Sequence, residues 1–332
     1  MAANATTHPT LLDLVKRSEP DGKIATIVEI LNETNEILDD MVWVEGNLPT
    51  GHRTTIRTGI PAPTWRKLYQ GVQPTKSTTV QVTDNCGMLE AYAEVDKALA
   101  DLNGNTNEFR LSEDQAHIEG MSQELAETLI YGNEGTEPEA FTGIMPRFND
   151  LSASNAENII DAGGTGTDNA SILLCVWGPN TGHGIVPKGS VGGLQMNDKG
   201  VVTIESIDGA GGRMEAYRTH YRMDAGLTIR DWRYFVRIAN IDRSALTVDA
   251  SSGANLPDLM FQALERLPNL STGRAAFYMD RGITTKLRQQ STYGVKSSTL
   301  TSQNLGGTMV TSFHEVPIRR VDAMSADEAR VV

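Results

Sequence analysis

Acidic residues are missing from one long stretch of this chain. No Asp or Glu occurs between Glu45 and Asp84, although the 332 residues together have a formal net charge of −13. The stretch contains five basic residues: Arg53, Arg57, Arg66, Lys67 and Lys76. Residues 84–140, which follow directly, contain fourteen acidic residues against Lys97 and Arg110. This change of sign indicates two surfaces that attract each other, and we expect them to meet between copies of the protein.

Cysteines and long apolar runs are also scarce. Cys86 and Cys175 are the only cysteines, which suits a reducing compartment with two buried thiols, and nothing in the sequence supports a disulfide between them. No apolar run approaches 18 residues, so we predict no membrane span. The first residues lack the features of a signal peptide. A pI of about 4.9 argues against general binding to nucleic acid, which requires clustered basic residues.

No motif for catalysis, metal or cofactor binding stands out. None of the six histidines is four residues from another, and none pairs with a cysteine at zinc spacing. The glycine-rich segments 162–169 (AGGTGTDN) and 182–190 (GHGIVPKGS) lack the strand–loop–helix order of a phosphate loop, and we interpret both as flexible loops. We therefore predict no catalytic residue, no cofactor and no metal site. A nucleotide-binding enzyme is kept as an alternative.

Arginine and aromatic residues gather between residues 213 and 237. They are Arg213, Tyr217, Arg218, Tyr221, Arg222, Arg230, Trp232, Arg233, Tyr234 and Arg237. One interpretation is a basic aromatic face for nucleic acid. The other is a sheet whose arginines pair with the many carboxylates of the chain. We favour the second, because alternation along a strand sends these residues to both faces of a sheet.

The first 84 residues predict helices followed by a hairpin. Apolar residues recur at helical spacing in residues 10–17 and in a second helix after Asp21, and these helices form an arm that packs on something else. Residues 46–83 are rich in Thr, Val and Ile around a middle interrupted by Gly and Pro, which predicts two long strands. Such a hairpin has almost no core of its own and is marginal in water, so we expect a partner surface to hold it.

Two further helices are predicted before residue 132. Residues 88–103 place Leu89, Tyr92, Leu99 and Leu102 on one face of the first. The second spans about 112–131, with a capping box at Ser112 and Gln115 and a stop at Gly132. Its predicted apolar face is formed by Ile118, Met121, Leu125 and Leu129. Its acidic face is formed by Glu113, Asp114, Glu119, Glu124 and Glu127, which we predict to receive the basic residues of a neighbouring copy.

The remainder of the chain mixes strands and helices. We expect a surface loop over 149–170, a buried strand at 171–177 (SILLCVW) and several strands between 201 and 240. A helix at 257–267, a strand followed by a helix at 275–290 and a last strand within 313–324 complete the prediction. The pattern is that of an α+β protein.

The order of these parts resembles the major capsid protein of tailed bacteriophages, whose Hong Kong phage-type fold is shared by encapsulins. The resemblance rests on the helical arm, the basic hairpin, the long spine helix and three segments: GNEGT (132–136), AAFYMDRGITTKLRQQ (275–290) and FHEVPIRRVDAM (313–324). It is greatest to coat proteins of short-tailed phages of the epsilon-fifteen and Bordetella-phage kind. The segment 231–242 resembles a peripheral-domain piece that usually closes the chain. Here it precedes the axial motifs, so a true match would imply permuted connectivity.

The resemblance implies a division into four parts. Residues 1–45 would be an N-terminal arm, 46–84 an extended β-hairpin loop, 85–245 a peripheral domain with the spine helix and inserted loops, and 246–332 an axial domain. Copies would assemble in the host cytoplasm into pentamers and hexamers of an icosahedral head that encloses double-stranded DNA.

The implied partners are other copies of the chain, a decoration or cement protein, a portal and a scaffolding protein. Packaged DNA would lie nearby without specific binding, and the protein would reside in the virion and not act as an enzyme. An encapsulin-like nanocompartment shell is the alternative function for the same fold.

Overall fold

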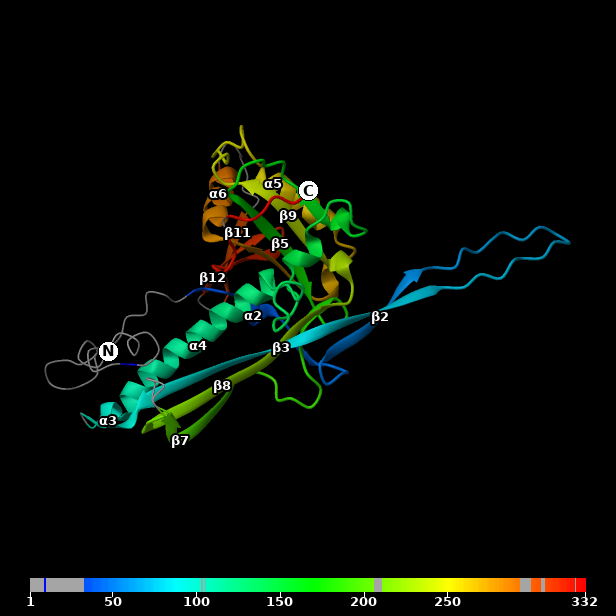
Figure 1. The fold of residues 1–332 in the computed structure, drawn as a ribbon. Helices are drawn as coiled ribbons and strands as arrows, with labels where there is room; N and C mark the ends of the chain where they lie inside the picture. The colour runs from blue at the N-terminus through cyan, green and yellow to red at the C-terminus, as the bar shows by residue number, and fades with distance from the viewer. Residues whose placement is uncertain are drawn as a thin grey trace. The chain divides into compact units, whose positions relative to one another are not determined.

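The computed structural model describes residues 9, 33–102, 104, 106–205, 211–292, 300–305, 308–325 and 327–332. The helix predicted at 10–17 and most of the helix predicted after Asp21 lie outside these residues. The chain forms two compact units (Figure 1). Unit 1 comprises Met1–Glu33, Met88–Ala126 and Val191–Asp224, and unit 2 comprises Thr34–Gly87, Glu127–Ser190 and Ala225–Val332.

The centre of unit 2 is strand β5 (Asn169–Trp177), in which every residue is buried. β5 pairs antiparallel with β9 (Phe235–Asp242) on one side and with β10 (Arg274–Met279) on the other. Further strands extend the sheet at both ends: β4 (Ile159–Asp161) beside β9, and β13 (Val316–Arg320), β12 (Thr308–Phe313) and β11 (Leu300–Leu305) beyond β10. A strand buried on both faces has a continuous apolar sequence, and the prediction of a buried strand at 171–177 is confirmed.

Two helices, α5 (Leu256–Arg266) and α6 (Arg281–Thr292), cover one face of this sheet. Their apolar residues join alternate residues of β5, β9 and β10 in one hydrophobic cluster. The predicted helix at 257–267 and the predicted strand and helix at 275–290 are therefore confirmed. The sheet and cluster combine segments from both sides of residue 245, where the sequence predicted a domain limit.

A smaller group of strands in unit 2 surrounds β6 (Gly182–Val186). β6 pairs in parallel with β1 (Trp43–Glu45) and antiparallel with the end of β8 (Arg213–Ile229). The expectation of a flexible loop over 182–190 is wrong for its first five residues, which are all buried. The glycine at 184 permits a close contact, because a Cβ there would lie 2.7 Å from Cε3 of Trp43.

Unit 1 contains a sheet and most of a long helix. The sheet is formed by β7 (Gln195–Glu205), by β8 up to Asp224 and by the second half of β3 (Thr78–Asp96). Helix α4 (Thr106–Tyr131) contributes Met121 to a cluster with Ala93 of β3 and Tyr221 of β8. The remaining short elements are α2 (Ile37–Asp40), α3 (Lys97–Ala100) and 3₁₀ turns at Met145–Phe148, Ala156–Asn158, Trp232–Tyr234 and Leu270–Thr272.

The predicted helix over 88–103 is wrong, because residues 88–96 belong to β3 and only α3 is helical. The segment also fits the two-residue period of a strand. Ala93 and Val95 are buried, whereas Met88 and Tyr92 are exposed on the opposite face. The helical turn begins only after Asp96, whose carboxylate accepts a hydrogen bond of 2.8 Å from the backbone N–H of Ala98.

Helix α4 ends before Gly132 as predicted but begins at Thr106, six residues earlier than expected. Ser112 therefore lies inside the helix, where its hydroxyl donates to the carbonyl of Phe109 at 2.8 Å and caps nothing. Met121, Leu125 and Leu129 are buried as expected. Ile118 is not, since 39% of its surface remains exposed.

The segment before β5 contains a further strand. The surface loop expected over 149–170 is interrupted by β4, where Ile159 and Ile160 are buried. No helix among the described residues has the length and apolar character to cross a membrane. Within the same ranges, no three His, Cys, Asp or Glu side chains gather where a metal ion could bind.

Candidate assembly surfaces

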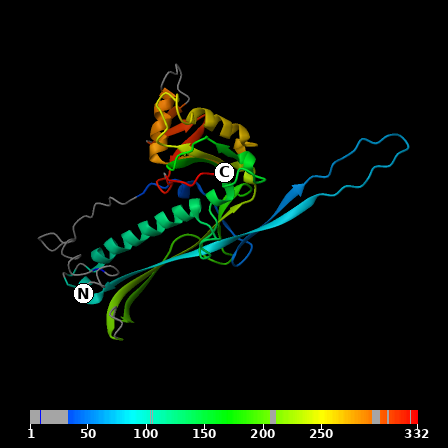
Figure 2. The same ribbon diagram turned by 45° about the horizontal axis from the view of Figure 1, so that its top comes forward.

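The acid-poor stretch forms a long β-hairpin. Strand β2 (Gly51–Gly59) pairs antiparallel with residues 78–85 of β3, from Gly51 opposite Asn85 to Gly59 opposite Thr78. Figures 1 and 2 show the two strands running side by side into the long turn between them. Residues 60–77, which we call the tip, form neither strand nor helix. The predicted two-stranded excursion is confirmed.

The five basic side chains of the hairpin face solvent. Arg53 and Arg57 lie on β2, while Arg66, Lys67 and Lys76 lie in the tip, and all five are exposed. Arg53 donates from Nε to the hydroxyl of Thr83 at 3.3 Å. Among the described residues, none of the five forms an ion pair. Their charge is thus available to another molecule.

The base of the hairpin is fixed by Asp84. Its Oδ1 accepts from Nη1 of Arg147 at 2.8 Å, and its Oδ2 accepts from the hydroxyl of Thr228. The Arg147 guanidinium also donates to the carbonyls of Thr142, Gly143 and Leu227. The whole polar set is therefore satisfied, and it joins the hairpin to two other segments of unit 2.

Two histidines pack against each other beside this ion pair. His52, opposite Asp84 in the hairpin register, meets His183 of β6 edge-on, with 5.9 Å between ring centroids. His183 is almost completely buried, at 1% exposure. Burial, followed by the neighbouring His52 and the positive charge of Arg230, lowers the pKa of His183 to about 4. The pKa of His52 is lowered by burial and by Arg230.

The five predicted acids of α4 do not share one face. At about 100° per residue, Glu113, Glu124 and Glu127 fall within about 60° of each other around the helix, while Asp114 and Glu119 lie about 100° or more from Glu113. Glu124 and Glu127 are exposed. Glu119 accepts hydrogen bonds from Nε2 of Gln123 and from the backbone N–H of Glu33.

Asp114 points toward the interior of unit 1. Burial raises its pKa, although Tyr221, Arg110 and His117 oppose the shift. Burial and the nearby Asp114 carboxylate in turn raise the pKa of Tyr221 to about 12. The structure thus makes Asp114 the least suitable of the five for a contact with another copy.

An exposed stripe on α4 was missed by the sequence analysis. Leu111, Gln115 and Ile118 recur at helical spacing and are exposed, and the exposed fractions of Leu111 and Ile118 are 58% and 39%. The stripe is bordered by Glu108 and Glu119. The signal was present in the sequence, but the period of an apolar stripe does not tell whether the stripe faces the core or another molecule.

Large apolar side chains also crowd the hairpin tip. Trp65 and Tyr69 are fully exposed, and the other large apolar residues of the tip are Ile60, Leu68 and Val72. Of the tip residues, only the basic ones were predicted to contact another copy. Aromatic and basic residues stand next to each other in the order Trp65–Arg66–Lys67–Leu68–Tyr69. This order in the sequence could have revealed the exposed aromatic side chains.

The arginines between 213 and 237 are largely engaged in ion pairs. In unit 1, Arg218 pairs with Glu94 at 2.5 Å and Arg222 with Asp224 at 3.0 Å. In unit 2, Arg237 pairs with Glu328 at 2.8 Å. Arg233 pairs with Asp231 at 2.7 Å. The interpretation as a sheet with paired arginines is therefore confirmed for these residues.

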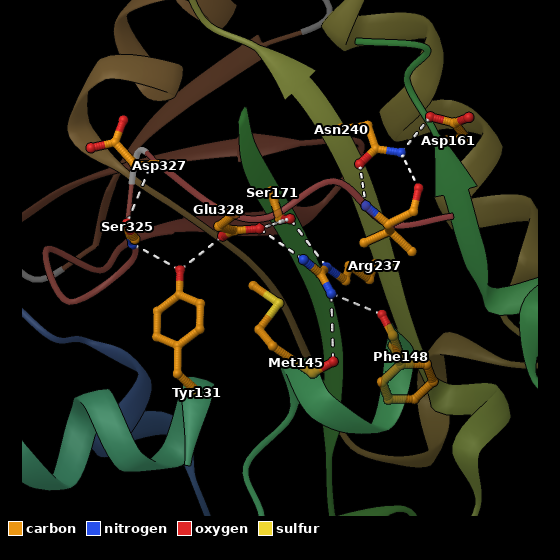
Figure 3. A network of polar contacts seen from close by, with 11 residues as sticks. Tyr131, Met145, Phe148, Asp161, Ser171, Arg237, Asn240, Ser325, Asp327 and Glu328 are labelled. Carbon is orange, nitrogen blue, oxygen red and sulfur yellow. Dashed lines mark hydrogen bonds and ion pairs between the residues drawn. The ribbon is translucent and has the colours of Figure 1, made fainter. Parts of the chain in front are cut away.

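The C-terminal segment is attached to β9 by buried polar contacts (Figure 3). Glu328 accepts from Arg237, from the hydroxyl of Ser171 and, at 2.8 Å, from the hydroxyl of Tyr131. Arg237 and Glu328 are each only 5% exposed in their side chains. Burial and the Glu328 charge raise the pKa of Tyr131 well above its usual value. Asn240 completes the attachment by pairing with both backbone groups of Val331.

The glycine-rich segment 162–169 has no helix after it. It joins β4 directly to β5, and the backbone N–H of Gly164 donates to the carbonyl of Asn240 at 2.9 Å. A phosphate loop requires a helix N-terminus at this place. Among the described residues 159–177, the arrangement that would support nucleotide binding does not occur.

Comparison with known proteins identifies related chains. A family model described as "Major capsid protein GP7" matches residues 19–332. A chain in the cryo-EM structure of bacteriophage Epsilon15 is 39% identical, with 100% of this chain and 99% of that chain covered and a TM-score of 0.80. No curated protein matches.

More distant solved structures include a phage capsid and an encapsulin. The bacteriophage JBD30 capsid is 9% identical, covering 87% of this chain and 91% of that one, with a TM-score of 0.48. The SrpI encapsulin of Synechococcus elongatus is also 9% identical, covering 72% and 94%, with a TM-score of 0.42.

Proposed function

The chain belongs to the GP7 family of major capsid proteins, and on this premise we propose that copies of it form pentamers and hexamers of an icosahedral phage head around double-stranded DNA. The observation that carries this proposal is the near-complete coverage in the comparison with the Epsilon15 chain, at 39% identity. The protein is a structural component of the virion. We propose that assembly takes place in the host cytoplasm and that no reaction is catalysed.

The four parts implied by the family resemblance have separate proposed roles. The arm (1–45) reaches a neighbouring subunit, the extended loop (46–84) lies across an adjacent subunit, and the peripheral (85–245) and axial (246–332) domains build the capsomer. The shared sheet of β5, β9 and β10 argues that the segment before residue 245 moves with the axial domain. A decoration or cement protein, a portal and a scaffolding protein are the proposed partners.

The basic hairpin is the proposed contact with the next subunit. Arg53, Arg57, Arg66, Lys67 and Lys76 are proposed to meet acidic residues of α4 in another copy. The exposed Glu124 and Glu127 suit this role best, together with Glu113 on the same side of the helix. Glu119 lies on another side of the helix, next to the exposed stripe. Asp114 is the weakest candidate because it points inward.

The expected effect of these charges is on assembly more than on folding. Exposed ion pairs contribute only about 0.2–1 kcal/mol each, and salt screens them. Repeated around a closed shell, such pairs set the register and rate of association. The net charge of −13 would also keep the inner surface from binding packaged DNA tightly.

A charge-reversal variant tests this proposal. Replacing Arg53, Arg57 and Arg66 with Glu should prevent shell formation in electron micrographs while leaving the circular dichroism and unfolding midpoint of the subunit unchanged. The matched control reverses the same number of charges at exposed residues outside the hairpin: Lys199, Arg213 and Arg274. Normal shells from the hairpin variant would refute the role of the hairpin, and a parent chain that forms no shells would refute the proposed function.

A further inference from the structure

The base of the hairpin contains two histidines whose polar atoms are not satisfied. Both ring nitrogens of His52 and both of His183 are buried and have no hydrogen-bond partner among the described residues. The hydroxyl of Thr54, which lies two residues beyond His52 on the same face of β2, is also buried without a partner there. Buried polar atoms normally form hydrogen bonds, and each one that does not costs free energy. The two rings therefore hold the hairpin base by packing and not by hydrogen bonds.

The same base is the place where the hairpin is attached to unit 2. The Asp84 ion pair and the contact between the two histidine rings both lie there. Among the described residues, Arg53 forms the only hydrogen bonds that lead from residues 53–83 to a residue outside the hairpin, and its partner is Asn47. The orientation of the whole hairpin thus depends on the contacts at its base.

Positive charge surrounds the two rings. The charged groups beside them are Asp84 on β3, Arg147 at the 3₁₀ turn Met145–Phe148, and Arg230 just after β8. Asp84 is the only carboxylate of this set, and its two oxygens already accept from Arg147 and Thr228. A proton added to either ring would therefore place a further positive charge in a partly buried site without a free acceptor in this set.

Protonation of the rings is unfavourable for this reason while the base is closed. Burial, the neighbouring His52 and Arg230 lower the pKa of His183 to about 4, although the Gly178 backbone and Asp84 oppose the shift. Burial and Arg230 also lower the pKa of His52. A histidine in water has a pKa of about 6.5. Because the pKa is lower in the closed base, the closed base is favoured above about pH 6.5 and loses this advantage as the pH falls toward 4.

We propose that the His52–His183 contact is a proton-sensitive clamp, which holds the hairpin base closed at neutral pH and releases it in acid before the subunit unfolds. Release separates the two charged rings, lets water reach them and changes the orientation of the hairpin relative to the β5 sheet of unit 2. Through His183 alone, lowering the pH from 7.5 to 4 should raise the ratio of open to closed base by about a hundredfold. The inference goes beyond the proposed function, since the clamp belongs to the single subunit.

Distance measurements between two spin labels test the clamp. Gln81→Cys on the exposed part of the hairpin and Gln289→Cys on α6 carry the labels in a Cys86→Ser chain, whose remaining Cys175 is fully buried. Labelled chains are diluted into an excess of unlabelled chain, so that only distances within one copy are recorded. Pulsed electron paramagnetic resonance of samples frozen between pH 7.5 and pH 4 gives the distance distribution, and circular dichroism of the same samples reports on the fold.

The parent chain is expected to show one distance at pH 7.5 and a second population below about pH 5, with unchanged circular dichroism. A distance that stays the same over the whole range would overturn the inference. A distance that changes only together with the loss of circular dichroism would overturn it as well, because the acid would then unfold the subunit and not release a clamp.

Variants of the two rings identify the groups that bind the protons. The double variant His52→Gln and His183→Gln has no ring to protonate at the base, so its distance distribution should not depend on pH. The matched control His220→Gln removes a histidine of unit 1 that pairs with Glu90, and it should respond like the parent. A double variant that responds like the parent would overturn the inference and point to Asp84 instead.

A single variant serves where the double variant does not fold. His52→Gln alone leaves one ring to protonate, so the second distance should appear at a lower pH than in the parent. A response at the same pH as in the parent would contradict the inference.

Discussion

Asp84 and Arg147 form an ion pair at the base of the hairpin, with 2.8 Å between Oδ1 and Nη1. Asp84 is 6% exposed in its side chain and Arg147 is 20% exposed, so neither charge is fully hydrated. The acid-poor stretch ends at this aspartate. The first acidic residue after the acid-poor stretch is therefore a structural anchor at the hairpin base and does not belong to the surface offered to another copy.

Removing this carboxylate should destabilise the subunit. We expect Asp84→Ala to lower the free energy of unfolding by about 3 kcal/mol, because it leaves the Arg147 guanidinium partly buried without its partner. Urea denaturation followed by tryptophan fluorescence measures the change. Arg53→Ala, an exposed position in the same hairpin, should change stability by less than about 0.5 kcal/mol. An unchanged midpoint for Asp84→Ala would show that the pair does not hold the hairpin base.

The His52–His183 contact predicts acid sensitivity. The unfolded chain binds a proton at His183 below about pH 6.5, whereas in the folded chain its pKa is about 4. Stability from this residue is therefore present above pH 6.5 and is lost as the pH falls toward 4, by up to about 3 kcal/mol. Urea midpoints measured from pH 7 to pH 4 should fall less steeply for His183→Gln than for the parent. His220→Gln serves as the control, and parallel curves for parent and His183→Gln would contradict the prediction.

The buried Arg237–Glu328 pair predicts strong non-additivity. Glu328→Leu alone should cost about 3–5 kcal/mol of unfolding free energy, because it leaves Arg237 buried and unpaired. Combining it with Arg237→Met removes the stranded charge, and the double variant should recover most of this loss. Denaturation of the two single variants and the double variant measures the coupling. A double variant as unstable as the sum of the single variants would rule out the pair as a coupled unit.

The close approach of β6 to Trp43 predicts a sensitive glycine. Gly184→Ala would place a methyl group 2.7 Å from the Trp43 ring, and the overpacking should destabilise the subunit by about 1–3 kcal/mol. Gly71→Ala in the hairpin tip is the matched control, because a Cβ there meets nothing within 4 Å. Equal thermal midpoints for the two variants would show that β6 can move away from Trp43.

Elements with a strong local signal could be predicted from the sequence. Helix α5 is capped by Asn255, whose side chain accepts from the backbone N–H of Asp258, and has apolar residues at helical spacing. Strand β5 is a continuous apolar run. In contrast, the apolar residues within 88–96 fit both the period of a helix and the period of a strand. These residues form a strand because they pair with β8. Local propensity cannot choose between two such solutions.

The candidate contact surfaces were predictable only in part. The five basic residues of the hairpin could be named from the sequence because a missing charge sign is visible without a fold. Which acids of α4 face outward could not be named, since the packing of unit 1 turns Asp114 inward and leaves Leu111 and Ile118 exposed. Ile118 was predicted on one apolar face with Met121, Leu125 and Leu129, because periodicity measures direction around the helix and not the presence of a neighbour.

The sequence by itself determined the charge separation between residues 46–83 and 84–140, the hairpin, and the resemblance to phage major capsid proteins. These follow from residue types in a local order. Only the tertiary structure decided that Asp84 pairs with Arg147, that His52 meets His183, and that Glu328 returns to Arg237. Each of these contacts joins residues more than 60 positions apart, and only the folded chain brings such partners together, because closing loops of this length requires the packing of the whole unit.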